Sequence, residues 1–259
     1  MASFSGQIQE AIIYAADLVR RARHTVILTG AGISTPSGIP DFRSDGRGLW
    51  AKDEPLEVAS QLIFRTHPEK FFAWFRPLAS SILEAQPNAA HLALAQLESR
   101  GLLQTILTQN IDILHQKAGS RRVIELHGTL STLSCTQCYR QFNSADFLDA
   151  FLRDAILPHC PVCGALLKPD VILFGEQLPQ KALDFAQREA RQCDLMIVAG
   201  SSLEVLPVAG LPMQAIDRGA HLIILNNSPT YLSVRADINI YADVAAVLPA
   251  IVEETLAHG

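Results

Sequence analysis

Four cysteines are arranged in two closely spaced pairs. They are Cys135 and Cys138, followed by Cys160 and Cys163, with two residues between the members of each pair. Two C-x-x-C pairs about 20 residues apart are typical of a zinc ion held by four thiolates. Because four thiolates leave no coordination position for water, we expect one structural zinc ion rather than a catalytic one. The fifth cysteine, Cys193, is expected to fill space in the core.

The charge of the cysteine segment indicates what it does not bind. Between residues 132 and 167 the cations are Arg140 and Arg153, and the acids are Asp146, Asp149 and Asp154. A net negative segment is a poor binder of phosphates, so we expect no nucleic-acid binding here. Its predicted task is to fold a small insertion that could not stabilise itself.

His127 is the candidate general base. It directly follows a short apolar strand pattern, Val123–Leu126. A neutral imidazole can accept a proton near physiological pH. A second polar set, Gln109–Asp112, follows the strand pattern Leu103–Leu107 in the same way. Ligands bind at the carboxyl ends of the strands in open α/β sheets, so we expect both sets at one edge.

A glycine-containing loop, Thr29–Ser44, follows the strand pattern Thr25–Leu28. Peptide N–H groups of such loops can face a phosphate. The loop departs from the usual dinucleotide fingerprint, because Thr35 stands at the third glycine position and no clear acid follows about 20 residues later. Both departures count against a hydride-transfer enzyme. A strand-ending turn is the alternative, but the nearby Asp41, Phe42 and Arg43 favour a ligand site.

The rest of the chain alternates between strand and helix patterns. Of its 259 residues, 49% are apolar and 18% are charged, which allows a sizeable core. Alternation of this kind predicts an α/β fold with a mostly parallel sheet and helices on both faces. Further strands are predicted at Asp170–Phe174, Leu195–Ala199, His221–Leu225 and Asp237–Tyr241. Helices are predicted at residues 7–22, 88–101, 114–119, 180–191, 207–218 and within 244–256.

Residues 45–87 differ in character, with an aromatic cluster among short helical patterns broken by prolines. Two interpretations remain open: the core of a small helical insertion, or the wall of a substrate pocket. No apolar run reaches the length of about 18 residues that indicates a membrane span. No secretory signal pattern is visible and the net charge is −5. We therefore expect a cytoplasmic protein that binds neither membrane nor nucleic acid.

Taken together, these motifs resemble those of the sirtuins, the NAD-dependent protein-lysine deacylases. The short termini of the chain resemble those of the bacterial and archaeal members. The resemblance runs through most of the chain in the family's order. It rests on the motifs Gly30–Arg43, Thr108–Asp112, His127-Gly128, the cysteine pairs, Lys168–Glu176 and Gly200–Leu203. It implies a Rossmann-type domain of residues 1–44, 88–131 and 165–259. It also implies a small domain made of a helical insertion, 45–87, and a zinc module, 132–164.

The resemblance implies that NAD lies between the two domains and is consumed as a substrate. His127 and Asn110 are the expected catalytic residues, with His127 taking a proton from a ribose hydroxyl. The expected products are nicotinamide, O-acetyl-ADP-ribose and free lysine. The residues expected to contact NAD are Gly30, Ala31, Thr35, Asp41, Phe42, Arg43, Gln109, Asn110, Ile111, Asp112, Gly200, Ser201, Ser202, Asn226, Asp243 and Val244. The segment Phe42–Trp50 is expected to become ordered when NAD binds.

By the same resemblance, an acyl-lysine peptide of a partner protein pairs as a strand with this chain. The residues expected to contact the peptide are Val171, Phe174, Gly175, Glu176 and Val205. Family members that remove succinyl or malonyl groups carry a tyrosine and an arginine where Phe75 and Leu78 align. Neither residue can pair with a carboxylate, so we expect neutral acyl groups, acetyl first. Ser201 replaces the family's usual threonine and keeps its hydroxyl.

Two other functions are compatible with the same residues. One is protein ADP-ribosylation in the same cleft. The other is a non-catalytic module that senses NAD or binds a partner through its zinc site. The joint presence of Asn110, Asp112 and His127 counts against the second, because a sensor does not need a base.

Overall fold

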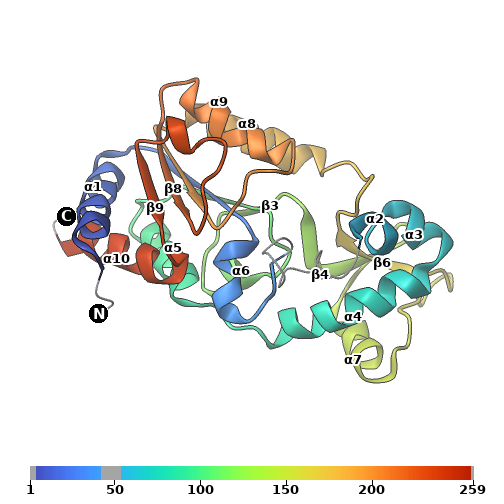
Figure 1. Ribbon diagram of the computed structural model, residues 1–259. Helices are drawn as coiled ribbons and strands as arrows, with labels where there is room; N and C mark the ends of the chain where they lie inside the picture. Colours follow the sequence, from blue (N-terminus) through green and yellow to red (C-terminus); the bar gives the residue numbers. More distant parts are fainter. Residues whose placement is uncertain (1–3, 42–53, 258–259) are drawn as a thin grey trace.

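The computed structural model describes residues 4–41 and 54–257 (Figure 1). Phe42 and Arg43, and the expected ordering of the segment up to Trp50, lie outside these ranges. Within the described part, none of the helices is both long and apolar enough to cross a bilayer.

The larger part of the chain is built on a six-stranded parallel sheet with the strand order β3-β2-β1-β7-β8-β9. Its strands are β1 (Thr25–Thr29), β2 (Thr105–Thr108), β3 (Val123–Glu125), β7 (Leu195–Ala199), β8 (His221–Asn226) and β9 (Ile238–Tyr241). Strands β1, β2 and β7 are buried along their whole length, as parallel strands covered on both faces should be. The predicted α/β fold with a parallel sheet is confirmed.

Helices cover both faces of this sheet (Figure 1). One face is covered by α1 (Gly6–Arg21), α5 (Ala89–Ser99) and α10 (Val244–Ala257), whose apolar residues share one core cluster with the sheet. The other face is covered by α8 (Gln180–Gln192), the 3₁₀ turn η4 (Val208–Gly210) and α9 (Leu211–Ile216). Cys193 lies in this second cluster and is buried, as predicted.

The smaller part combines helices with an antiparallel sheet of order β5-β4-β6. The strands are β4 (Gly128–Cys135), β5 (Gln141–Asn143) and β6 (Leu167–Val171), and the helices are α2 (Pro55–Val58), α3 (Gln61–Thr66), α4 (Pro68–Glu84) and α7 (Ala145–Asp154). Phenylalanines of α3 and α4 form an aromatic core with Phe151 of α7, in which most of the rings pack edge to face. The predicted strand Asp170–Phe174 is wrong in position: the strand begins at Leu167 and pairs with β4, outside the parallel sheet.

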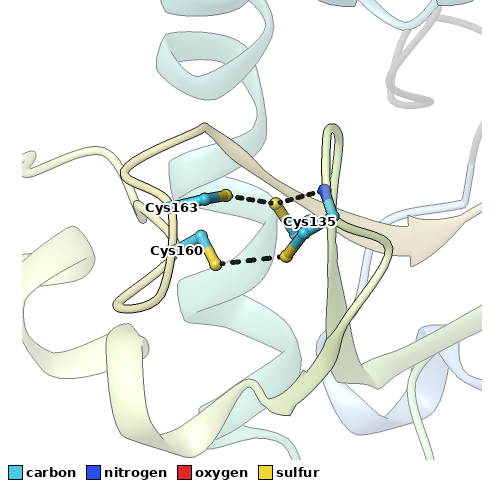
Figure 2. Close-up of side chains that lie close together, drawn as sticks. Cys135, Cys160 and Cys163 are labelled. Carbon is cyan, nitrogen blue, oxygen red and sulfur yellow. Dashed lines mark hydrogen bonds between the residues drawn. The ribbon is translucent and has the colours of Figure 1, made fainter.

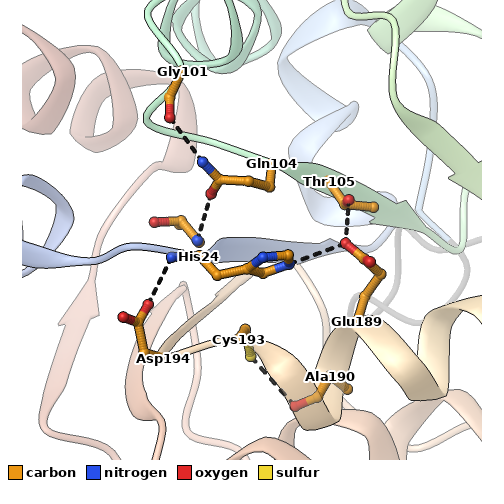
Figure 3. Close-up of polar contacts among 9 residues, drawn as sticks. His24, Gly101, Gln104, Thr105, Glu189, Ala190, Cys193 and Asp194 are labelled. Atoms are coloured by element: carbon orange, nitrogen blue, oxygen red, sulfur yellow. Dashed lines mark hydrogen bonds and ion pairs between the residues drawn. The ribbon is translucent and has the colours of Figure 1, made fainter.

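Short elements complete the chain at the edge where the parallel strands end. They are η1 (Ala31–Ile33), η2 (Thr35–Ser37) and α6 (Leu114–Lys117), whereas η5 (Ser233–Arg235) precedes β9 and is bonded to it through Asn239. The opposite edge is closed by polar side chains (Figure 3). There Glu189 accepts a hydrogen bond from Thr105 and lies 3.2 Å from His24 Nε2, while Asp194 accepts the backbone N–H groups of Arg23 and His24.

Candidate active site and metal centre

The glycine loop packs directly against the turn that follows β7. Gly32 N donates to the carbonyl of Gly200 at 2.9 Å. A Cβ on Gly30 or Gly32 would lie 2.8 or 2.9 Å from backbone atoms of Gly200, and a Cβ on Gly200 would lie 2.3 Å from Ile33 N. The two turns leave β1 and β7, which are neighbours where the strand order reverses. Ligands bind at this switch point in open α/β sheets.

Asn110 and Asp112 are buried beside the glycine loop. The Asn110 side-chain amide donates to the carbonyl of Gly30 and to Ser34 Oγ, both at 3.1 Å. Ser34 Oγ donates in turn to Asp112 at 2.6 Å, and the other carboxylate oxygen of Asp112 accepts the N–H of Leu114. The polar set predicted after β2 and the loop predicted after β1 are therefore joined in one buried network.

A buried histidine pair, which was not predicted to be part of the site, extends this network. His115 Nε2 lies 3.0 Å from the hydroxyl of Thr29, which also donates to Thr108 Oγ1 at 2.9 Å. His91 packs against the His115 ring. His91 Nδ1 accepts the N–H of Asn88, whose amide donates to the carbonyl of Ile33. The signal for His91 was its place three residues after an N-cap asparagine.

His127 is held in one orientation by the backbone. Its Nδ1 lies 3.1 Å from the carbonyl oxygen of Gln109. A carbonyl only accepts hydrogen bonds, so Nδ1 carries the proton and Nε2 keeps its lone pair in the neutral ring. Burial lowers the pKa of His127, and the hydrogen bond to Gln109 opposes part of this effect. The ring is therefore neutral at pH 7 and chemically able to accept a proton.

The remaining predicted cofactor residues lie along the same edge. Gln109 donates through its amide to Ser201 Oγ at 2.8 Å, joining the turns after β2 and β7. Ala31 starts η1, and Thr35 starts η2 and donates to the carbonyl of Gly32. Asp41 lies four residues after the end of η2, Ile111 lies between Asn110 and Asp112, and Ser202 follows Ser201. Asn226 ends β8, while Asp243 accepts the N–H of Ala245 where α10 begins at Val244.

The predicted peptide contacts gather at the end of β6, on the segment that follows it and on the loop after β7. Phe174 donates its N–H to the carbonyl of Ala59 and accepts the N–H of Gln61, so it pairs with the helical insertion. Val171 is buried, whereas the Phe174 side chain and Gly175 are exposed. Val205 lies in the loop after β7.

The four cysteines converge as predicted (Figure 2). The sulfur atoms of Cys135, Cys138, Cys160 and Cys163 all lie within 4.8 Å of one another. Cys135 Sγ and Cys163 Sγ are 3.4 Å apart, and Cys138 Sγ and Cys160 Sγ are 3.7 Å apart. A tetrahedral zinc ion with bonds of about 2.3 Å to sulfur implies sulfur–sulfur distances of about 3.8 Å. The donor set therefore fits one zinc ion.

Comparison with known proteins decides the family. A model of the Sir2 family matches residues 30–207, which is more than half of the chain. The chain belongs to the Sir2 family. It is 44% identical over 248 residues to an NAD-dependent protein deacylase of Archaeoglobus fulgidus. The alignment covers 95% of this chain and 97% of that protein. An NAD-dependent protein deacetylase of Geobacillus kaustophilus is 47% identical over 216 residues, with 83% and 86% covered.

Solved Sir2 structures share the whole architecture. A structure that describes the mechanism and regulation of Sir2 enzymes has a TM-score of 0.91 at 43% identity, covering 97% of this chain and all of that one. Sir2 with a p53 peptide and NAD+ has a TM-score of 0.85 at 40% identity, with 93% and 97% covered. A Sir2 protein bound to a myristoylated histone peptide has a TM-score of 0.83 at 39% identity, with 96% and 98% covered.

Proposed function

We propose that this chain is an NAD-dependent protein-lysine deacetylase that consumes NAD and releases nicotinamide, O-acetyl-ADP-ribose and free lysine. The observation that carries the proposal is the neutral His127, fixed by Gln109 at the sheet edge where the two glycine turns meet. The Sir2 relatives that are named deacylases and deacetylases support it. We assign NAD binding to residues 1–44, 88–131 and 165–259, and the small domain to residues 45–87 and 132–164.

The cradle formed by the glycine turns fits the phosphates of NAD. A Cβ at Gly30, Gly32 or Gly200 would meet atoms of the facing turn, so these glycines let the two turns pack together. Peptide groups of both turns are thereby brought to one place, where they can face a phosphate. When bound, NAD supplies the ADP-ribosyl group and nicotinamide as the leaving group. Gly200, Ser201 and Ser202, with Asn226, Asp243 and Val244, are assigned to the adenosine side.

The polar residues take three roles in the reaction. His127 Nε2 accepts a proton from a ribose hydroxyl, because its lone pair is free of the Gln109 hydrogen bond. Asn110, whose amide is fixed by Gly30 and Ser34, holds the ribose at the reacting end. Asp112 and Ile111 bind the nicotinamide amide. Asn110 and Asp112 are buried, and a site closed to solvent limits competing water.

The testing experiment is turnover of an acetyl-lysine peptide with and without NAD, with nicotinamide and O-acetyl-ADP-ribose followed by liquid chromatography and mass spectrometry. Both products should form only when NAD and peptide are present. His127→Ala should lower the rate by about 10²–10⁴-fold. The matched control is His159→Ala, which removes an exposed histidine outside the proposed site. Radiolabel transferred from NAD to protein, without the small product, would favour ADP-ribosylation instead.

The acyl group is proposed to be neutral. Phe75 and Leu78 are buried in the aromatic core of the small part of the molecule, where neither offers a charge. A succinyl group would bring a carboxylate, and a carboxylate in such surroundings needs a bidentate cation. An acetyl-lysine peptide is therefore expected to be turned over faster than a succinyl-lysine peptide; equal rates would refute this preference.

A specific observation favours longer neutral acyl groups as a second substrate class. An apolar cavity of about 530 Å³ lies between α4, α7 and the antiparallel sheet. Leu130 and Ile113, close in sequence to His127 and Asp112, line it together with Phe72 and Phe75. Lys117 is the charged residue among the described lining residues, and its ammonium donates to the carbonyl of Ala85. Cavities of this size and polarity suit hydrocarbon chains.

A further inference from the structure

Lys168 and Glu176 form an ion pair that is largely withdrawn from solvent. Lys168 Nζ lies 3.0 Å from Glu176 Oε2, and the two side chains are 19% and 16% exposed. Lys168 lies on β6, and Glu176 is the last residue of the turn 173–176 that follows this strand. The resemblance to the sirtuins predicts a contact with the peptide for Glu176 and no role for Lys168.

The pair closes the turn between β6 and the loop that precedes α8. Glu176 N donates to the carbonyl of Leu173 at 3.0 Å, and Leu173 N donates to the Glu176 carboxylate at 2.9 Å. Gly175 allows this reversal with a φ of +88°. Lys168 Nζ also donates to the carbonyl of Val171 at 2.7 Å, so its ammonium ties the end of β6 to the carboxylate.

The turn connects the candidate base with the helical insertion. Ile172 N donates to the carbonyl oxygen of His127 at 2.9 Å. Phe174 is bonded on both sides to Ala59 and Gln61, at 3.0 and 2.9 Å. A shift of the turn would therefore move the backbone of His127 and the loop before α3 together.

We propose that the Lys168–Glu176 ion pair is a positioning device that fixes the 173–176 turn in the shape that receives the acyl-lysine peptide. The inference rests on the proposed function. A peptide that adds as a strand is held by backbone hydrogen bonds, so its affinity depends on how well the receiving edge is ordered beforehand. Lys168 and Glu176 supply that order without touching the acetyl group or NAD.

Removing either charge should loosen the turn. Lys168→Met leaves the Glu176 carboxylate without its cation and frees the Val171 carbonyl, whereas Lys168→Arg keeps a cation within reach. Glu176→Gln keeps an oxygen for Leu173 N but removes the charge. If the loss of these charge-assisted hydrogen bonds is passed on to the peptide, its KM should rise about tenfold.

The experiment measures KM for an acetyl-lysine peptide and for NAD separately, in the wild type and the Lys168→Met, Lys168→Arg and Glu176→Gln variants. The peptide KM should rise about tenfold in Lys168→Met and Glu176→Gln, stay within about twofold in Lys168→Arg, and leave the NAD KM unchanged. The matched control is Thr105→Val, which removes a buried hydrogen bond to the Glu189 carboxylate at the opposite edge of the parallel sheet. It should lower the melting temperature but change neither KM.

An unchanged peptide KM in Lys168→Met, or equal rises in both KM values, would overturn the inference. Peptide affinity is also measured without turnover, by fluorescence anisotropy of a labelled acetyl-lysine peptide. If the wild type binds the peptide but releases no nicotinamide, the proposed function fails while weaker binding by Lys168→Met still supports the inference. If the wild type binds no peptide, both are overturned.

Discussion

The imidazole rings of His91 and His115 pack edge to face in the interior, with centroids 4.9 Å apart. Burial lowers the pKa of His91 to about 4, although the negative charge of Asp112 raises this pKa in part. Burial also lowers the pKa of His115 to about 3, and the neighbouring His91 adds to this effect. Both rings are therefore neutral at pH 7, and the pair lies beside the network that joins the glycine loop to Asn110.

Stability should fall in mild acid because of this pair. An unfolded histidine has a pKa near 6.5, so below that pH the unfolded chain binds protons that the folded chain excludes. The free energy of unfolding should drop by about 2 kcal/mol per histidine between pH 7 and pH 5. Urea unfolding at both pH values should show a smaller drop in His115→Gln than in wild type. His67→Gln, at an exposed site, is the control; an equal drop in all three proteins would contradict the prediction.

The activity should persist to lower pH than an ordinary histidine base would allow. Burial lowers the pKa of His127, so its neutral form remains available as the pH falls through 6.5. In a pH profile of kcat/KM for the acetyl-lysine peptide, the acidic limb assigned to His127 should lie below pH 6.5. A limb above pH 6.5 would show that the ring is stabilised in its charged form or is not the base.

Gly200→Ala should remove NAD binding and lower stability. Gly200 has a φ of +64°, and its added Cβ would lie 2.3 Å from Ile33 N, so the two turns would be forced apart. Isothermal titration with NAD and thermal melting measure the two effects. Gly210→Ala is the matched control, because its Cβ meets nothing within 4 Å. A Gly200→Ala protein with wild-type NAD affinity would remove the cradle from the proposed site.

The metal centre should be required for the fold of the small part and not for the chemistry itself. Cys138→Ser should abolish the binding of one zinc ion per chain, measured by elemental analysis, and should lower the melting temperature. Cys193→Ser replaces a buried cysteine outside the cluster and should keep the zinc ion. Full zinc occupancy in Cys138→Ser would contradict the four-thiolate assignment.

Narrowing the apolar cavity should lower the activity on long acyl groups more than the activity on acetyl groups. Ala145 lines the cavity at the start of α7 and is exposed, so Ala145→Trp can be accommodated without disturbing the core. Its kcat/KM should fall for a myristoyl-lysine peptide and remain near wild type for an acetyl-lysine peptide. Asp146→Trp, on the same helix but outside the lining, is the control. Equal effects on both peptides would indicate that the long chain does not enter this cavity.

Much of the fold follows from local patterns in the sequence. The buried strands β1, β2 and β7 are short apolar runs with polar or glycine residues directly after them, and the cysteine spacing needs no tertiary information. The polar residues after these strands could be placed at one edge because parallel strands end together.

The features that could not be predicted from the sequence depend on contacts between elements that are distant along the chain. Strand β6 was misplaced because an apolar run extends to Phe174, whereas burial alternates along Leu167–Val171 with Lys168 and Asp170 less buried. That alternation is typical of an antiparallel strand. His91 and His115 come from different helices, so their packing has no local signature. The Lys168–Glu176 pair likewise forms only when the chain turns back at Gly175.

The interlocked turns at Gly32 and Gly200 bear on how the protein is made. The two turns are separated by most of the chain, and neither can form the cradle alone. Until β7 has emerged from the ribosome, the glycine loop of the nascent chain lacks the turn at Gly200 against which it packs. Contacts this distant in sequence form late, because a long loop must close before they contribute. The nucleotide pocket is therefore expected to mature only after synthesis has passed Gly200, so premature termination before that residue leaves a zinc module without a nucleotide pocket.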